Sequence, residues 1–531
     1  MALSSSSLIR LSILYILFFV GCSPNIEYDF LIEGAHIYVG DGAAPFEGNV
    51  GIKGDEIHYV GSYTNLSAKR VIEANGLAVC PGFIDVHAHL EPLMQLPESE
   101  SHVRQGVTTA LGGPDGGGPD PFVSYLDSLE ELDLGMNVAF LVGHNRVRAR
   151  VMELARRAPT AQEMSQMQQI VQDAMDAGAY GLSTGLKYLP GTFAKTDEVI
   201  ALAKVAAQNE GIYTSHIREE GLGLLPAVRE VIDVASGAQM TAVITHHKAM
   251  GQPMWGASSQ TLGLVDSARE AGLDVRIDQY PYNASYTGIS VLIPSWGLAG
   301  GREAFLSRIG DNSIRDSLLR GIVFNLQNDR GGGDLRRVQL ARVRWNPEME
   351  GKTLFECLIA EEIEPTLENG AKLVLDIQEA GGASAIYHAM DDQDVDRIMV
   401  HPQTMIASDG RLARWQEGHP HPRWYGTFPR VLGHYVREKE LLPLETAIHK
   451  MTGLPASLLN LDDRGYLTVG FKADIVIFDP QTVIDKATFE KPHQYPEGIR
   501  YVFCNGVLKV DQGRFQPGGG GKVLRRNSAN L

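Results

Sequence analysis

The sequence predicts an α/β protein: a (β/α)8 barrel of the TIM type, joined to a small discontinuous β-sandwich built from the N- and C-terminal segments. Two observations support this prediction. The middle of the chain alternates strand-like and helical patterns in units of about 30 residues, and so many units favour a closed barrel over an open sheet. Short alternating strands with Gly, Asp and Asn turns occur near both ends.

The composition is that of an ordinary globular protein, with 44% hydrophobic and 21% charged residues. A length of 531 residues suits one large barrel with a smaller module better than a single compact domain. The net charge of −17 argues against nucleic acid as a partner, because phosphate binding requires a basic surface. We therefore expect a small-molecule substrate, and the sequence leaves the oligomeric state open.

Residues 1–22 have the layout of a secretory signal peptide. Arg10 precedes LSILYILFFVG, an apolar run too short to cross a bilayer as a helix. The ending FVGC resembles a bacterial lipobox, which would make Cys22 the lipidated first residue of the mature chain. Phe19 replaces the usual Leu of that box, so plain cleavage and an uncleaved anchor stay open as alternatives. We expect an exported protein of the periplasm or an outer-membrane lipoprotein, in contact with a membrane only through this anchor.

The predicted sandwich has two parts. Residues 23–80 contain the strand patterns FLIEGAHIYVG, GNVGIKGDEIHYVG and RVIEANGLAVC. Residues 456–515 repeat this texture in RGYLTVGFKADIVIFDP and IRYVFCNGVLKVDQGRF. Residues 516–531 are rich in glycine at their start, and we expect a flexible tail there.

The predicted barrel spans residues 81–455. Strand patterns such as MNVAFLVGHN, IYTSHIREEG and MTAVITHHKAMG alternate with helical patterns such as AQEMSQMQQIVQDAMDAG and DEVIALAKVAAQNEG. The stretch from about residue 294 to 400 is charged and irregular, and we interpret it as an insertion before the last barrel strand, in the position of a lid.

Polar side chains recur where the predicted barrel strands end, which is where barrels of this type build their sites. His, Asp and a modified Lys together suit a zinc-like ion, and two histidines at i and i+2 share one strand face. Beyond residue 22, only three scattered cysteines remain, too dispersed for a cysteine metal site. The candidate metal ligands are His87, His89, Asp115, Lys187, His216, His246 and Asp409.

Several motifs carry a resemblance to a known family: PGFIDVHAH, GLSTGLKYLPG, YTSHIREEG, ITHHKAMG, MIASDG and HPRWYGTFPRVLGHY. Over residues 28–512 the chain resembles the amidohydrolase superfamily and, within it, the N-acyl-D-amino-acid deacylases, or D-aminoacylases. The HPRWYGTFPRVLG run is specific to the deacylase branch, whereas the HxH motif alone identifies only the superfamily. The resemblance implies one or two divalent metal ions, with Zn²⁺ as the expected cofactor.

The resemblance also implies roles for individual ligands. His216 and His246 match the family's tight metal position, and His87, His89 and Asp409 match a weaker second position. His246 is preferred over His247 because adjacent strand residues face opposite ways.

One departure from the family concerns the residue between the two metals. The family usually has GNCG where this chain has GPDG, so Asp115 takes the place of a bridging cysteine. Asp115 is either a bridging carboxylate or an ordinary turn residue in GGPDGGGPDP. Lys187 offers a second solution, a carboxylated lysine bridge; its alternative is a substrate-contacting or solvated lysine. The sequence leaves these alternatives open.

The resemblance further implies a site for the substrate α-carboxylate, for which Arg and Lys are suited by charge and hydrogen bonding. Arg423 is the stronger candidate, whereas Tyr280 competes with the interpretation of a core aromatic residue. The matching positions are Tyr188, Lys248, Tyr280, Ser285 and Arg423.

The implied reaction is hydrolysis of the amide bond of an N-acyl-D-amino acid, or of a dipeptide ending in a D-residue. Asp409 would act as general base and then as general acid around metal-activated hydroxide. One alternative is another superfamily enzyme that acts on cyclic amides, lactones or dipeptides. An alternative of a different class is a non-catalytic surface-binding lipoprotein.

Overall fold

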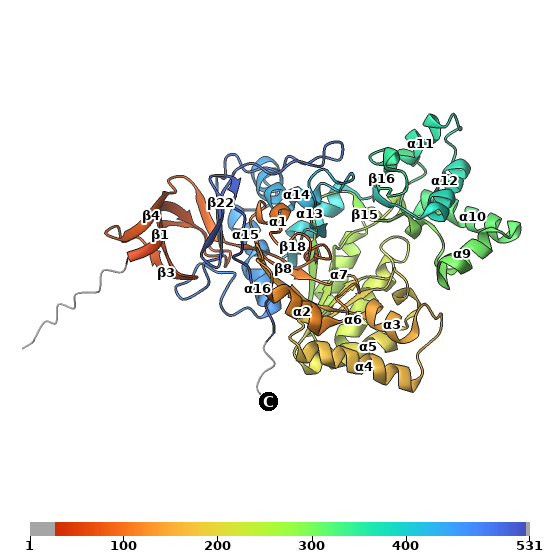
Figure 1. Ribbon diagram of the computed structural model, residues 1–531, viewed down its shortest axis with the longest axis horizontal. Coiled ribbons are helices and arrows are strands. Elements are labelled where there is room, and N and C mark those ends of the chain that lie inside the picture. The colour runs from red at the N-terminus through yellow and green to blue at the C-terminus, as the bar shows by residue number, and fades with distance from the viewer. Residues whose placement is uncertain (1–26, 527–531) are drawn as a thin grey trace, which may run out of the picture.

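The computed structural model describes residues 27–526, so the predicted signal segment 1–22 lies outside the described residues (Figure 1). At its centre is a barrel of eight parallel strands, which confirms the predicted fold class. In chain order these strands are β6 (Phe83–Asp85), β8 (Val107–Gly112), β9 (Asn137–Phe140) continued by β10 (Val142–Gly143), β11 (Gly181–Gly185), β12 (Ile212–His216), β13 (Ala242–Ile244), β14 (Val275–Gln279) and β18 (Thr404–Ile406).

The barrel closes between its first and last strands through a short parallel pair. Just past β6 and β18, β7 (Ala88–His89) and β19 (Gly410–Arg411) pair in register. The backbone N–H of Asp409 also donates to the carbonyl of His87 at 2.9 Å. The first and last predicted metal ligands of the chain are thus neighbours by backbone pairing.

Helices follow the barrel strands and pack around them (Figure 1). They are α1 (Glu100–Val103), α2 (Phe122–Glu130), α3 (His144–Met152), α4 (Ala161–Asp176), α5 (Thr196–Gln208), α6 (Leu224–Ala238), α7 (Ser258–Glu270), α13 (Asp392–Val400), α14 (Arg423–Arg430), the π-helix η6 (Val431–Glu438), α15 (Leu444–Met451) and α16 (Gly453–Leu459), with short 3₁₀ turns at η1 (Gly191–Phe193) and η2 (Gln252–Met254).

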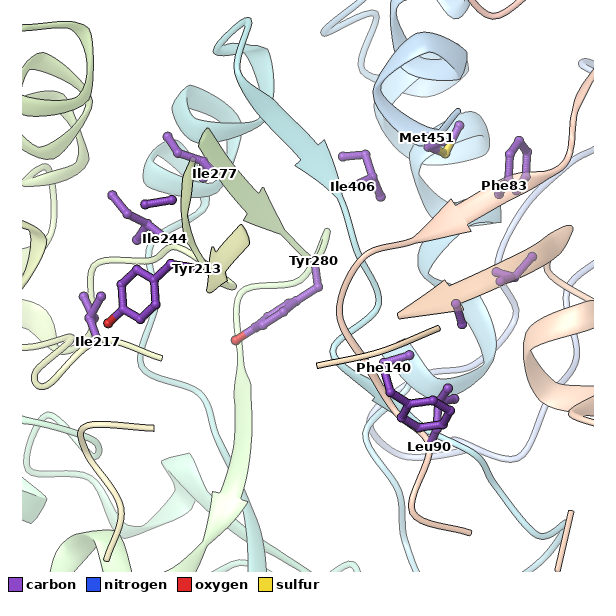
Figure 2. Close-up of a cluster of buried hydrophobic side chains, with 14 of the residues drawn as sticks. Phe83, Leu90, Phe140, Tyr213, Ile217, Ile244, Ile277, Tyr280, Ile406 and Met451 are labelled. Atoms are coloured by element: carbon purple, nitrogen blue, oxygen red, sulfur yellow. The ribbon is translucent and has the colours of Figure 1, made fainter. Parts of the chain in front are cut away.

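Strand alternation divides the barrel core into two layers. Ile212 and Val243 point inward and share a buried cluster with Leu458 of α16. The next residues along, Tyr213 and Ile244, belong to the larger cluster between strands and helices. Figure 2 shows part of that layer, where Tyr213, Ile244, Ile277 and Ile406 come from successive strands β12, β13, β14 and β18. Residues on the inner face at the carboxyl ends of the strands are therefore free to form a site.

The β module is built from both ends of the chain, as predicted, and its strands form one nine-stranded sheet. The N-terminal part contributes β1 (Glu27–Ile37), β2 (Phe46–Lys53), β3 (Glu56–Gly61), β4 (Ser67–Glu73) and β5 (Ala78–Pro81). The C-terminal part contributes β20 (Ile475–Phe478), β21 (Ile499–Cys504), β22 (Val507–Asp511) and β23 (Arg514–Phe515). The two parts meet where β5 pairs antiparallel with β20.

The insertion is a folded subdomain with its own core, on the side of the barrel away from the β module (Figure 1). Its sheet has the order β15 (Ser285–Gly288), β17 (Ser384–Tyr387), β16 (Val338–Arg342). Its helices are α8 (Ser295–Leu298), α9 (Gly301–Ile309), α10 (Asn312–Asn328), α11 (Leu354–Ala360) and α12 (Leu367–Ala380), with 3₁₀ turns η3 (Ile289–Leu292), η4 (Leu335–Arg337) and η5 (Pro347–Met349). The predicted bounds of about 294–400 are shifted, because β15 precedes them and α13 packs as a barrel helix.

Residues 516–526 are the described part of the predicted flexible tail, and in the structure they are held by backbone hydrogen bonds. Residues 516–526 run along the barrel wall, where Val138 donates its backbone N–H to Lys522 and Leu524 donates to Val138. The Gly521 N–H donates to Leu134, and the Arg526 N–H donates to Gly178. Backbone pairing of this kind is independent of side chains, so the glycine-rich sequence did not reveal it.

Within residues 27–526, no helix is both long enough and apolar enough to span a bilayer.

Truncation of the chain after Gln516 should destabilise the barrel, because it removes these backbone hydrogen bonds. At about 1 kcal/mol for each net hydrogen bond, we expect the melting temperature to fall by about 5 °C. Differential scanning calorimetry measures this change, and truncation after Arg526 is the matched control. Equal melting temperatures for the two truncated proteins would contradict the structural role of this segment.

Candidate metal centre and substrate pocket

Two groups of metal-capable side chains meet at the carboxyl ends of the barrel strands. The first group is His87, His89, Asp115 and Asp409, and the second is Asp115, His216 and His246. Within each group the potential ligand atoms lie within 4.8 Å of one another. The structure thus brings together six of the seven predicted metal ligands.

Asp115 belongs to both groups. Its Oδ1 lies 3.5 Å from His87 Nε2 and 3.5 Å from His246 Nε2. Its Oδ2 lies 3.7 Å from His89 Nε2 and 3.7 Å from His216 Nδ1. Each carboxylate oxygen therefore faces one histidine of each group, so this carboxylate lies where it can bridge two metal ions. Burial opposes ionisation of Asp115, yet the neighbouring His87 and His246 hold the pKa of its carboxyl group well below the usual value.

The backbone is strained at three of these residues. Asp115, His246 and Asp409 all have positive φ angles, of 55°, 35° and 44°. Residues other than glycine adopt this conformation at a cost, and such positions cluster at functional sites. At Asp115 the turn and the ligand interpretations both apply, because the left-handed turn is what directs the carboxylate into the cluster.

Local chain geometry explains how each histidine reaches the centre. His216 ends β12 on the inward face, two and four residues after Thr214 and Ile212. His246 lies beyond the end of β13, and its backbone N–H donates to Asp278 Oδ1 at 2.6 Å. His247 turns outward and its Nε2 contacts Thr261 Oγ1 at 2.7 Å, so of these two adjacent histidines it is His246 that reaches the cluster.

His87 and His89 are placed by a buried carboxylate. A bend after β6 separates them from the strand, and Asp85 Oδ1 accepts a hydrogen bond from the backbone N–H of His87 at 3.2 Å. The same oxygen accepts from the N–H of Ser408 at 3.0 Å, and Asp85 Oδ2 accepts from the Ser408 hydroxyl. One carboxylate therefore aligns the chain before His87 with the chain before Asp409.

The donor set fits a divalent metal. Among residues 27–526, both ring nitrogens of His87 are buried without a hydrogen-bond partner, as are His216 Nε2 and Asp115 Oδ1. Buried polar atoms normally have partners, and a metal ion would provide them for the His87 ring and for Asp115. Imidazole and carboxylate are also the ligand types that zinc and related ions prefer.

Lys187 is not part of either group. Its Nζ donates to Glu219 at 2.8 Å and lies 3.7 Å from Asp329 of the insertion. The lysine extends past the end of β11 to these two carboxylates, which accounts for its charge. The structure therefore places Asp115, and not Lys187, between the two groups.

Asp409 is held by a buried cation. Arg423 Nη2 lies 2.9 Å from Asp409 Oδ1, and His89 Nε2 lies 3.2 Å from the same oxygen. Burial alone would raise the pKa of Asp409, but the Arg423 charge and the His89 hydrogen bond bring it below the usual range. Asp409 is thus a carboxylate near neutral pH and able to accept a proton. In the described part of the chain, the Nε and Nη1 atoms of Arg423 are buried without a hydrogen-bond partner, so part of this guanidinium can bind an anion.

A chain of alternating charges leads from His246 toward the insertion. Lys248 Nζ contacts His246 Nδ1 at 2.8 Å and donates to Glu220, and Arg330 Nη2 donates to Glu220 Oε2 at 3.2 Å. Burial lowers the pKa of Lys248. Burial also opposes ionisation of Glu220, but the charges of Lys248 and His216 keep its pKa well below the usual value. Glu220 therefore orients two cations beside the metal-capable groups.

These groups open into one cavity of about 310 Å³. All five predicted substrate contacts line it. Tyr188 donates or accepts a hydrogen bond with Thr287 at 3.1 Å, and Ser285 Oγ lies 3.4 Å from Arg330 Nη1. The centroid of the Tyr280 ring lies 5.5 Å from Lys248 Nζ and 4.5 Å from the Arg423 guanidinium carbon. The predicted substrate contacts in this cavity are Tyr188, Lys248, Tyr280, Ser285 and Arg423.

Sequence reasoning missed two buried charged residues of this cavity. Glu220 lies four residues after His216 within the quoted motif YTSHIREEG, and its spacing was a usable signal. Arg330 lies in the insertion, in the irregular stretch NDRGGGDLRR, where no pattern predicts proximity to the barrel. Only the folded insertion brings Arg330 to Glu220 and Ser285.

Comparison with known proteins agrees with this geometry. The model of the amidohydrolase family matches residues 70–509. The chain is 35% identical to a D-aminoacylase of Alcaligenes xylosoxydans xylosoxydans, over 96% of this chain and 99% of that protein. It is similar to a crystal structure of N-acyl-D-glutamate deacylase from Bordetella bronchiseptica with zinc and a phosphonate mimic of the tetrahedral intermediate (TM-score 0.81, 34% identity, 94% of this chain, 100% of that chain). A D-aminoacylase structure with a binuclear metal centre has a TM-score of 0.79 at 34% identity, with the same coverage.

The Asp115→Ala substitution should lower metal affinity by at least about tenfold, because it removes the one side chain shared by both groups. Lys187→Gln should leave the metal content unchanged, since Lys187 is already paired with Glu219. Inductively coupled plasma mass spectrometry after dialysis against a buffered chelator measures both. Asp120→Ala, in the same loop but paired with the exposed Arg150, is the control. Metal loss in Lys187→Gln with retention in Asp115→Ala would reverse the assignment of the bridge.

Proposed function

This chain belongs to the amidohydrolase family, and we propose that it hydrolyses the amide bond of N-acyl-D-amino acids to a carboxylate and a free D-amino acid. The observation that carries the proposal is the composition of one cavity. Two metal-capable groups joined by Asp115 share it with Lys248, Arg330 and Arg423, which are cations that recognise a carboxylate. Relatives with D-aminoacylase and N-acyl-D-glutamate deacylase activity support the substrate class.

We propose Zn²⁺ as the metal. His216 and His246 would hold it at one position, and His87, His89 and Asp409 would hold it at a second position. Asp115 would serve both positions. Such an ion supplies Lewis acidity, which acidifies water and polarises an amide carbonyl. Nitrogen and carboxylate donors support zinc, and zinc is present in the N-acyl-D-glutamate deacylase structure.

Asp409 moves the proton. Its carboxylate accepts a proton from water while the water oxygen attacks the amide carbon, and the carboxylic acid then donates that proton to the departing amine nitrogen. Arg423 holds Asp409 by one nitrogen and keeps it ionised between turnovers. Lys248, Tyr280, Ser285 and Arg330 hold the substrate α-carboxylate at the inner end of the cavity, which fixes the amide over the cluster.

Metal-dependent release of amino acids from matched N-acetyl-D- and N-acetyl-L-amino acids tests the proposal. We expect turnover of D-substrates only, and loss of that turnover on chelation. Asp409→Asn should lower kcat by about 10²- to 10⁴-fold while the far-ultraviolet circular dichroism is unchanged, because the amide cannot accept the proton.

A panel of hydantoins and lactones serves as the comparison set for this measurement. Preferential turnover of either class, or near-normal kcat for Asp409→Asn, would refute the assignment.

We also propose that the protein is exported and carries a lipid on Cys22. The support is the sequence of residues 1–22 alone, with its charged start, apolar centre and FVGC ending. Its metal chemistry does not depend on this anchor.

Expression in a bacterial host with labelled palmitate should label the wild-type chain and not Cys22→Ser. Ser23→Ala is the control that changes the neighbouring residue and keeps the thiol. Label retained in Cys22→Ser, or absent from the wild type, would contradict lipidation.

A further inference from the structure

A second cavity, of about 550 Å³, lies against the first. The two cavities share the lining residues Tyr286, Ser384, Arg411 and Trp424. Tyr286 and Trp424 form the waist between them, with ring centroids 5.3 Å apart in an edge-on contact. In the insertion, one wall of the second cavity comes from β16, the residues after it and the residues just before β17. The other wall comes from the barrel loops after β7 and β19.

The second cavity is rich in arginine. Four guanidinium groups line it, against one lining carboxylate, Glu417. Arg342 pairs with Glu350 and Glu417, and Arg411 pairs with Glu91. Including those two outer carboxylates, four positive charges still face three negative ones. The excess is local, because the whole chain carries a net charge of −17.

Two of these arginines have spare hydrogen-bonding capacity. Within residues 27–526, Arg344 forms no ion pair, and the only one of Arg414 is a 3.6 Å contact to Glu417, which Arg342 already engages. Beside them, Trp345 is 42% exposed, and its indole N–H donates to the carbonyl of Gly382 at 2.9 Å. A fixed aromatic surface next to incompletely paired guanidinium groups suits a ligand with an apolar stem and a carboxylate end.

The first cavity determines which part of a substrate reaches this region. Its inner end holds Lys248 and Arg330 beside His246, and its outer end holds Arg411, which pairs with Glu91 next to His89. The metal-capable groups lie between these ends. An amino acid held by its α-carboxylate at the inner end places its amide over those groups, so its acyl chain continues toward Arg411 and Trp424.

We propose that the two cavities form one binding cleft and that the second takes an acyl chain ending in a carboxylate. The inference rests on the proposed deacylase function and specifies its substrate class: N-carboxyacyl-D-amino acids, of which a peptidyl-D-amino acid with an acidic residue is one form. Arg344 and Arg414 bind the distal carboxylate, and Trp345 covers the chain.

The test is steady-state kinetics of the full chain with three substrates of one D-amino acid, carrying N-acetyl, N-butyryl or N-succinyl groups. Butyryl and succinyl have equal carbon chain length and differ in the terminal carboxylate. We expect the highest kcat/KM for the succinyl substrate. The Arg344→Gln/Arg414→Gln double variant should lower that value about tenfold and leave the other two within about twofold. Added salt should weaken the preference, because both arginines are solvent-exposed.

The charge-conserving Arg344→Lys/Arg414→Lys variant is the control and should keep most of the succinyl preference. Equal loss for all three substrates, or no succinyl preference in the wild type, would overturn the second site. N-acetyl-D-glutamate is measured in parallel as a fourth substrate. If the double variant loses turnover of this substrate only, the cavity takes the amino-acid side chain, which also overturns the inference. No turnover of any substrate would reject the proposed function itself, and this result is distinct from the others.

Discussion

The buried carboxylate of Asp85 is the constraint on which the site depends. It accepts hydrogen bonds from the backbone N–H of His87 and from that of Ser408 just ahead of Asp409, two residues more than 300 positions apart in sequence. These bonds and the β7–β19 pair close the barrel. Without that closure, the ligands from the first and last strands would not face Asp115 together. The same contacts therefore close the barrel and bring the metal-capable residues together.

The histidine ligands could be predicted from sequence because strand ends in a parallel barrel converge whatever their separation along the chain. His216 follows directly from this rule. Asp115 was ambiguous, since a glycine-rich turn and a ligand have the same local sequence, and only the direction of its side chain separates them. Lys187 was misplaced as a candidate bridge because its partner Glu219 is close in space but gives no pattern with it. Arg330 could not be found, because the packing of a separate core sets the position of the insertion.

The insertion contributes polar groups to the site as well as covering it. Lys187, Glu219, Asp329, Arg330, Glu220 and Lys248 form a run of opposite charges between barrel loops and insertion. Buried charges of this kind are costly unless each has its partner, so the insertion can adopt few positions relative to the barrel. The geometry of the carboxylate-binding end is thereby linked to the packing of a subdomain that supplies none of the metal-capable groups.

The sheet that joins both chain ends has a further consequence, for the timing of synthesis. Strand β5 pairs with β20, whose residues leave the ribosome almost 400 residues later. Contacts at such separation in sequence form late, because loop closure must precede them. The edge of β5 that pairs with β20 therefore stays unpaired until translation is nearly complete. An unpaired strand edge of this kind is prone to aggregation, so the nascent chain depends on protection of β5 until β20 has been made.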